Sequence, residues 1–161
     1  MRFPVVAMLL VALVTGCGGG DDAGAPATGA PATEIPGGGD PGDVQVIDDW
    51  SSTLARGDVE AAAELFAIPS VAENVVLIEI EDENDALRFN ASLPCGARLI
   101  HAETQGEFTT ATFRLLERPG RGTCGDGVGE TAQTSFVIED SKIVEWRRVG
   151  LPGNELEGPI A

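Results

Sequence analysis

Few side chains in this sequence could carry acid–base chemistry. His101 is the only histidine among 161 residues, and it lies in a segment whose pattern predicts a β-strand. Alternation along that strand places it on the same face as Leu99, from which it could enter a cavity as a general base partnered by Asp48 or Asp49. A single histidine in a strand is typical of a structural or surface residue. We therefore favour a chain without a catalytic residue, and the alternative is catalysis by His101 with Asp48 or Asp49.

Other kinds of functional site are excluded by motif and by charge. The chain has no P-loop, no serine nucleophile elbow, no HExxH motif and no dinucleotide fingerprint. Two cysteines and one distant histidine are not a ligand set for zinc, so we expect no metal and no cofactor. The formal net charge of −16 repels phosphates, which excludes nucleic acid as a partner.

The N-terminus has the plan of an export signal. Arg2 precedes an apolar run over residues 3–14, which is shorter than the roughly 20 residues of a membrane-spanning helix. The sequence VTGC at residues 14–17 resembles the lipobox of bacterial lipoproteins. This resemblance implies that residues 1–16 are removed and that Cys17 receives a diacylglycerol and an acyl chain such as palmitate. An ordinary secretory signal is the alternative.

A change of composition separates this signal from the folded part. Residues 18–43 contain nine glycines, four prolines and five acidic residues, and no lysine or arginine. Such a segment cannot bury a core, so residues 17–43 are expected to form a lipidated cysteine followed by a disordered tether. Residues 44–161 have the length of one compact domain. The protein is expected on the outer face of the bacterial plasma membrane, held there by its lipid.

The periodicity of the domain predicts helices first and strands afterwards. Helical spacing of apolar residues over 47–54 and 59–66 predicts two short helices, with Gly57 and Asp58 between them and Pro69 as a stop. A β-branched run at 75–80 is followed by a polar, helix-compatible stretch at 82–91. Four further strands form two hairpins. Their expected ranges are 97–104, 109–117, 131–138 and 142–149. This order predicts an α+β domain with helices packed on a curved antiparallel sheet.

Cys95 and Cys124 are expected to form a disulfide. A turn near Gly106 pairs residues whose numbers sum to about 213, which places Cys95 opposite Arg118, a few loop residues from Cys124. The compartment is oxidising and Cys17 is taken by lipid, so one pairing is left.

The helical opening VIDDWSSTLARGDVEAAAELFA and the closing hairpin TSFVIEDSKIVEWRRV resemble the nuclear transport factor 2-like superfamily, which includes polyketide cyclases and ketosteroid isomerase. More narrowly, the chain is similar to secreted actinobacterial lipoproteins that carry such a domain. The resemblance implies a cone with helices across the concave face of the sheet, a pocket inside it, and dimerisation through the open sheet. Ketosteroid isomerases use a tyrosine in their oxyanion hole, and this chain has no tyrosine.

Aromatic residues are expected to line or fill the cone. The expected pocket residues are Trp50, Phe89, His101, Phe113 and Trp146. Arg114 and Arg148 alternate with apolar neighbours, and an anionic ligand is compatible with the acidic chain only if one of them faces inward. We favour a non-catalytic envelope lipoprotein that binds a small apolar ligand or a protein partner. The alternatives are an isomerase, dehydratase or cyclase acting in the pocket, and a structural accessory subunit of a membrane complex.

Overall fold

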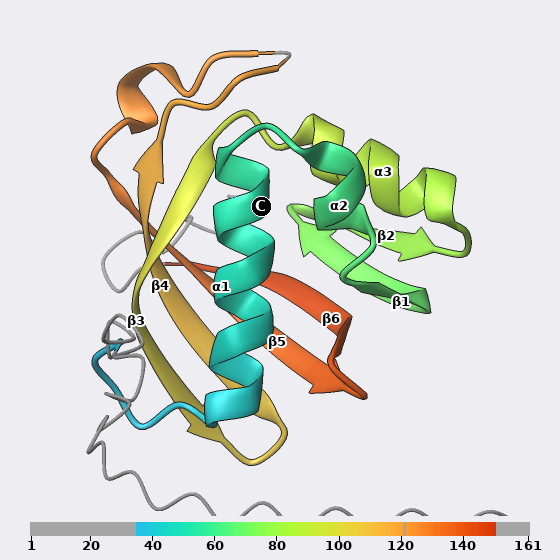
Figure 1. Ribbon diagram of the computed structural model, residues 1–161, viewed down its shortest axis with the longest axis vertical. Coiled ribbons are helices and arrows are strands. Elements are labelled where there is room, and N and C mark those ends of the chain that lie inside the picture. Colours follow the sequence, from blue (N-terminus) through green and yellow to red (C-terminus); the bar gives the residue numbers. More distant parts are fainter. Residues whose placement is uncertain (1–34, 121, 151–161) are drawn as a thin grey trace, which may run out of the picture. The chain divides into compact units, whose positions relative to one another are not determined.

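A six-stranded sheet dominates the computed structural model, which describes residues 35–120 and 122–150. The strands run in the order β2-β1-β6-β5-β4-β3, and the long helix α1 crosses one face of the sheet (Figure 1). The shorter helices α2 and α3 lie on the side of β1 and β2. The helices are α1 (Pro41–Ala55), α2 (Val59–Ala63) and α3 (Glu83–Ser92). The strands are β1 (Phe66–Asn74), β2 (Val76–Ile80), β3 (Gly96–Gln105), β4 (Phe108–Leu116), β5 (Thr131–Glu139) and β6 (Lys142–Val149).

The predicted α+β class is confirmed, but the sheet is mixed rather than wholly antiparallel. Four of the five strand pairs are antiparallel, whereas β1 runs parallel to β6. Parallel neighbours need a long connection, and here the chain between β1 and β6 includes α3 and four other strands. The hairpin turns lie where the sequence predicted them. Gly106 and the Asp140–Ser141 pair adopt the positive φ angles that such tight turns need.

The expected second helix is too long by several residues. Helix α2 ends at Ala63, and Phe66 is the first residue of β1 instead of the last apolar position of a helix. Pro69 does not stop a helix; it lies within β1, after a cis peptide bond. Phe66 is nevertheless buried as expected, because its ring packs against Phe89 at a centroid distance of 5.6 Å.

Helix α1 forms where its apolar spacing predicted it. Ile47, Trp50 and Leu54 are buried on the face that packs against the sheet. Asp40 caps the first turn, since its side chain accepts hydrogen bonds from the backbone N–H groups of Gly42 and Asp43. The helix therefore begins a few residues before the expected domain start at residue 44.

Residues 35–40 pack along the outer edge of the sheet. The Ala102 N–H in β3 donates to the Pro36 carbonyl at 3.1 Å, and the Asp40 N–H donates to Thr104 Oγ1 at 2.7 Å. Ile35 is partly buried against the core. This end of the expected tether is therefore structured and covers part of an edge strand. The expected signal at residues 1–16, Cys17 and the rest of the tether up to residue 34 lie outside the described residues.

Candidate functional site

An apolar cavity of about 290 Å³ lies between α1 and the sheet, at the end of the cone near the disulfide. Its walls come from α1, from the segment before β3, from the 3₁₀ turn before β5, and from β1, β3, β4, β5 and β6. Its large apolar lining residues are Trp50, Leu54, Leu93, Phe113, Leu115 and Trp146. Three of them are aromatic, and Trp50 packs edge-to-face against Phe113 and Trp146 with centroid distances of 6.0 and 6.2 Å. Such a lining favours an apolar ligand body.

Three polar residues cross one end of this lining on adjacent strands. Thr134 in β5 pairs with Arg148 in β6, and on the other side of β6 Asn74 follows Glu73, whose parallel partner is Arg147. Neighbouring strands lie about 4.8 Å apart, so these three side chains form a short polar row. All three line the cavity, and Trp146 lies two residues before Arg148 on the same face of β6.

Two buried polar atoms at this end have no partner among the described residues. They are the indole Nε1 of Trp146 and the amide Oδ1 of Asn74. Trp146 is only 5 % exposed. The other tryptophan behaves differently, because Trp50 Nε1 donates to Asn90 Oδ1 at 2.8 Å in the core. A buried polar group without a hydrogen bond costs about 1–3 kcal/mol, and here a donor and an acceptor on two cavity-lining residues both lack a partner.

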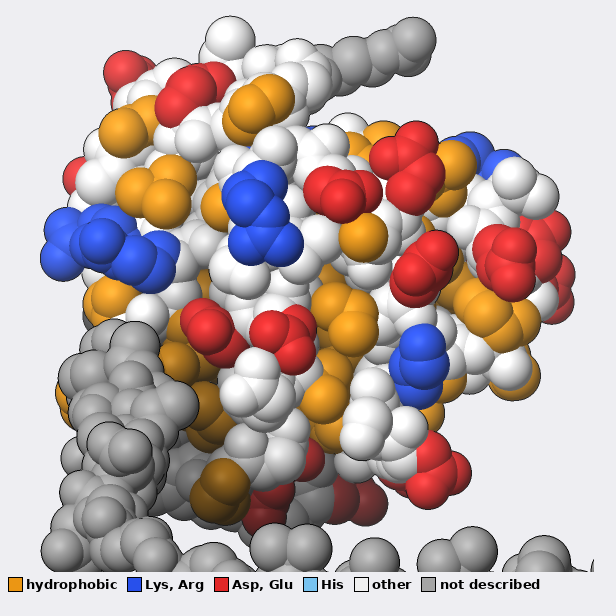
Figure 2. All heavy atoms as spheres, in the orientation of Figure 1, with side chains coloured by type: hydrophobic (Ala, Val, Ile, Leu, Met, Phe, Trp, Pro, Cys, Tyr) orange, Lys and Arg blue, Asp and Glu red, His pale blue; other side chains and the backbone are white. Residues whose placement is uncertain are grey.

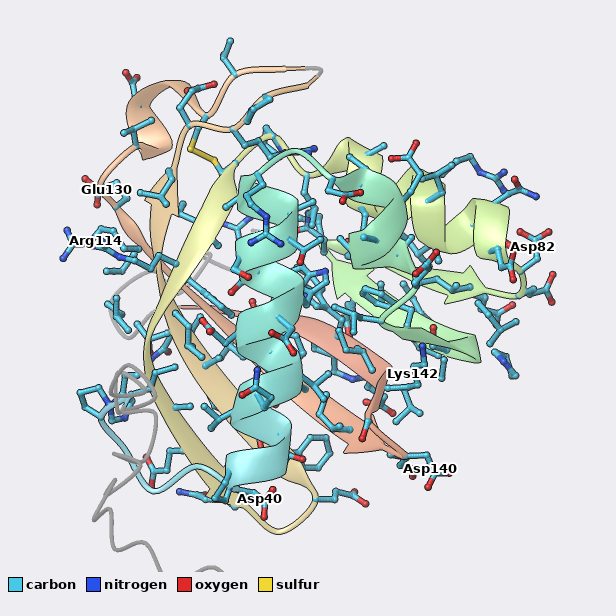
Figure 3. All side chains as sticks on the ribbon, viewed as in Figure 1. Asp40, Asp82, Arg114, Glu130, Asp140 and Lys142 are labelled. Carbon is cyan, nitrogen blue, oxygen red and sulfur yellow. A yellow bond between two sulfur atoms is a disulfide. The ribbon has the colours of Figure 1, made fainter. Side chains whose placement is uncertain are left out.

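The disulfide predicted between Cys95 and Cys124 is present (Figure 3), and Cys95 lines the cavity. Gly127 packs on it so closely that an added Cβ would lie 3.2 Å from Cys124 Sγ. The 3₁₀ turn Gly125–Gly127 is thereby held against Leu115. The wall next to Leu93 is fixed as well, because Arg118 donates to the Leu93 carbonyl from Nε at 3.0 Å and from Nη2 at 2.6 Å.

His101 does not lie in the cavity, contrary to the expectation from alternation. The pairing of β3 with β4 shifts by one residue between Leu99 and His101, which is a β-bulge. A bulge reverses the inward and outward positions that follow it, so Leu99 and Ala102 are buried and His101 is exposed. Simple alternation over the whole strand could not predict this shift.

Asp48 and Asp49 do not line the cavity either. Asp48 is half-buried in α1, where burial and then the charge of Asp49 raise the pKa of its carboxyl group. Asp49 is exposed. The described lining residues include neither a carboxylate nor an imidazole.

Of the five expected pocket residues, Trp50, Phe113 and Trp146 line the cavity. Phe89 lies behind it in the core, with its ring 5.1 Å from that of Trp146. Sequence reasoning missed Asn74 and Thr134. Thr134 carries a signal, since it alternates with Phe136 along β5, but Asn74 lies in a strand that the sequence did not predict.

The two arginines that the sequence singled out lie on opposite faces of the sheet. Arg148 lines the cavity. Arg114 points outward from β4, away from α1, and donates to the Gly129 carbonyl at 2.7 Å (Figure 3). The face of the molecule over α1 carries many separate acidic side chains and a few basic ones (Figure 2).

No described helix has the length and apolarity needed to cross a bilayer. The described residues also contain no cluster of three or more His, Cys, Asp or Glu side chains that could hold a metal ion.

No family model matches the chain, and no curated protein matches its sequence. Solved structures do match its fold. A candidate polyketide cyclase from Sinorhizobium meliloti aligns with a TM-score of 0.52 and 16 % identity over 65 % of this chain and 94 % of that one. A nuclear transport factor 2-like protein of unknown function from Cytophaga hutchinsonii gives 0.51 and 8 % identity over 66 % of this chain and 87 % of the other.

A third match comes from Catenulispora acidiphila. This protein of ketosteroid isomerase-like fold, in complex with trimethylamine, gives a TM-score of 0.51 and 10 % identity over 66 % of this chain and 85 % of its own. At these identities the likeness concerns the fold alone. The described domain has the nuclear transport factor 2-like cone fold, as the resemblance of its opening helices and closing hairpin implied.

Proposed function

We propose that this protein is a membrane-anchored envelope lipoprotein whose cone domain binds a small, largely apolar molecule without transforming it. One observation carries the proposal: the unpartnered Trp146 Nε1 and Asn74 Oδ1 both belong to residues that line the same apolar cavity. A ligand with an acceptor for the indole N–H and a polar group for the Asn74 amide would satisfy both while its apolar body leaves water.

The chemistry of the lining supports binding over proton transfer. General acid–base catalysis needs a titratable side chain within hydrogen-bond reach of the substrate. Asp48, Asp49 and His101 all lie away from the cavity wall. Some structural neighbours carry names from the cyclases and isomerases, but this fold hosts many activities and the site decides among them.

The experiment uses the chain from Gly18 onward, which lacks only the expected signal and the lipidated cysteine. It is titrated with an envelope lipid extract while tryptophan fluorescence is recorded, and bound molecules are identified by native mass spectrometry. Trp50 and Trp146 are the only tryptophans and both line the cavity, so occupancy should change the spectrum.

Three variants locate the binding. Ala132→Leu narrows the cavity and should abolish the spectral change, whereas Gln133→Leu on the other face of β5 should not. Trp146→Phe removes the indole N–H together with the five-membered ring, and calorimetry should show binding weakened by at least about two- to tenfold, the value of one hydrogen bond. A chain that takes up nothing from the extract, or that binds equally with Ala132→Leu, would refute the proposal. If the protein converts a bound component into a product, it is an enzyme and not a binding protein.

A further inference from the structure

Arg148 differs from its neighbour Arg147 in what its guanidinium group contacts. Arg147 lies on the other face of β6, where it binds Glu73 at 2.6 Å and Glu145 at 2.7 Å. Arg148 lines the cavity and takes part in none of the ion pairs among the described residues. In a chain of net charge −16, this leaves one arginine at an apolar cavity available for an anion.

The surroundings of Arg148 suit a single anionic group. The residue is exposed, so it lies at the mouth of the cavity and its charge stays hydrated when no ligand is bound. Thr134 flanks it on the adjacent strand β5, and its hydroxyl group can donate to the same anion. The apolar and aromatic lining begins one row further in, at Trp146.

We propose that the cavity takes a small carboxylic acid, with its carboxylate bound by Arg148 at the mouth and its apolar body against Trp50, Phe113 and Trp146. This inference rests on the proposed function, because it specifies the ligand of the same cavity. The planar guanidinium group can bind a carboxylate through two parallel hydrogen bonds. One arginine in a strongly acidic protein balances a singly charged carboxylate better than a doubly charged phosphate.

The test compares octanoate with octanamide, which has the same chain and almost the same shape but no charge. Calorimetry of the chain from Gly18 onward at low ionic strength should show octanoate binding at least about tenfold more tightly, with the advantage shrinking as salt is added. Arg148→Gln should bring octanoate to the level of octanamide and leave octanamide unchanged. Arg98→Gln, on the outer face of β3, is the matched control and should leave both unchanged.

Each other result overturns the inference. Equal binding of octanoate and octanamide, or tighter binding of octyl phosphate than of octanoate, would show that the cavity does not select a carboxylate. If Arg148→Gln still binds octanoate more tightly than octanamide, Arg148 does not bind the carboxylate. Unchanged octanamide binding shows that this variant is folded. If neither octanoate nor octanamide binds, only this inference is overturned, because the titration with lipid extract tests the proposed function separately.

Discussion

Asp48 is a half-buried acidic residue within α1. Burial and then the neighbouring charge of Asp49 raise the pKa of its carboxyl group above the ordinary value of 3.8. The folded state therefore holds this proton more tightly than the unfolded chain does. The stabilising contribution is complete below pH 3.8 and is lost as the pH rises through the folded pKa.

Asp48→Asn should consequently stabilise the protein near neutral pH. We expect the free energy of unfolding to rise by up to about 0.5 kcal/mol at pH 7, a small value because the carboxyl is partly solvated. The gain should disappear below pH 3.8, where the native carboxyl is already protonated. Urea unfolding of both proteins at pH 7 and below pH 3.8 measures this difference in the free energy of unfolding. Glu107→Gln in an exposed turn controls for the loss of one negative charge, and an equal gain in both variants would contradict the argument.

The candidate site could be predicted only in part at this scale. Trp50, Phe113 and Trp146 follow from periodicity, since large aromatic residues at inward positions must line or fill a cone. The missing hydrogen-bond partner of the Trp146 indole N–H could not be predicted, because it depends on which side chains lie near the indole in the folded chain. The sequence left the orientation of the Arg148 side chain open, because a position in an alternating strand can face either the solvent or the cavity.

At the scale of elements, residues 35–40 are expected to stabilise the domain although their composition reads as linker. A chain that begins at Pro41 lacks the Asp40 cap of α1, the hydrogen bonds to β3 and the packing of Ile35. Its free energy of unfolding should fall by about 1–3 kcal/mol relative to a chain that begins at Glu34. Urea midpoints measure this, and Asp40→Ala in the longer chain should reproduce about 1 kcal/mol of it. Coincident unfolding curves would show that this segment is only a linker.

Local patterns predicted most elements, and the misses have physical causes. The strands β3 to β6 lie close to their expected ranges because each has a clear period and turn residues at its ends. Helix α3 lies where the sequence has only a polar, helix-compatible stretch. Strand β1 was missed because Phe66 continues the helical spacing and Pro69 is rarely found inside a sheet. Its parallel pairing with β6 joins segments about 75 residues apart, which no local pattern encodes.

At the scale of the whole molecule, we propose that Cys17 decides where the protein resides. Cys17→Ser should move it from the membrane to the soluble fraction and should stop cleavage by the lipoprotein-specific peptidase, because that processing follows lipidation of the thiol. Cell fractionation and intact mass measure the two effects. Cys95→Ser is the matched control, since it removes a disulfide and leaves the lipidation site, and it should remain membrane-bound. A Cys17→Ser protein retained on membranes would contradict the prediction.

The covered edge of β3 has a mechanical consequence. The residues that connect the domain to its N-terminal side are the same ones that bond to this edge through Pro36 and Asp40. A pulling force that arrives along the chain meets these few hydrogen bonds one after another before it reaches α1. Under load the segment would peel away first, and bare strand edges would then allow neighbouring copies to pair. If the chain is anchored through Cys17, as we propose, tension on it would thus favour pairing between neighbouring copies.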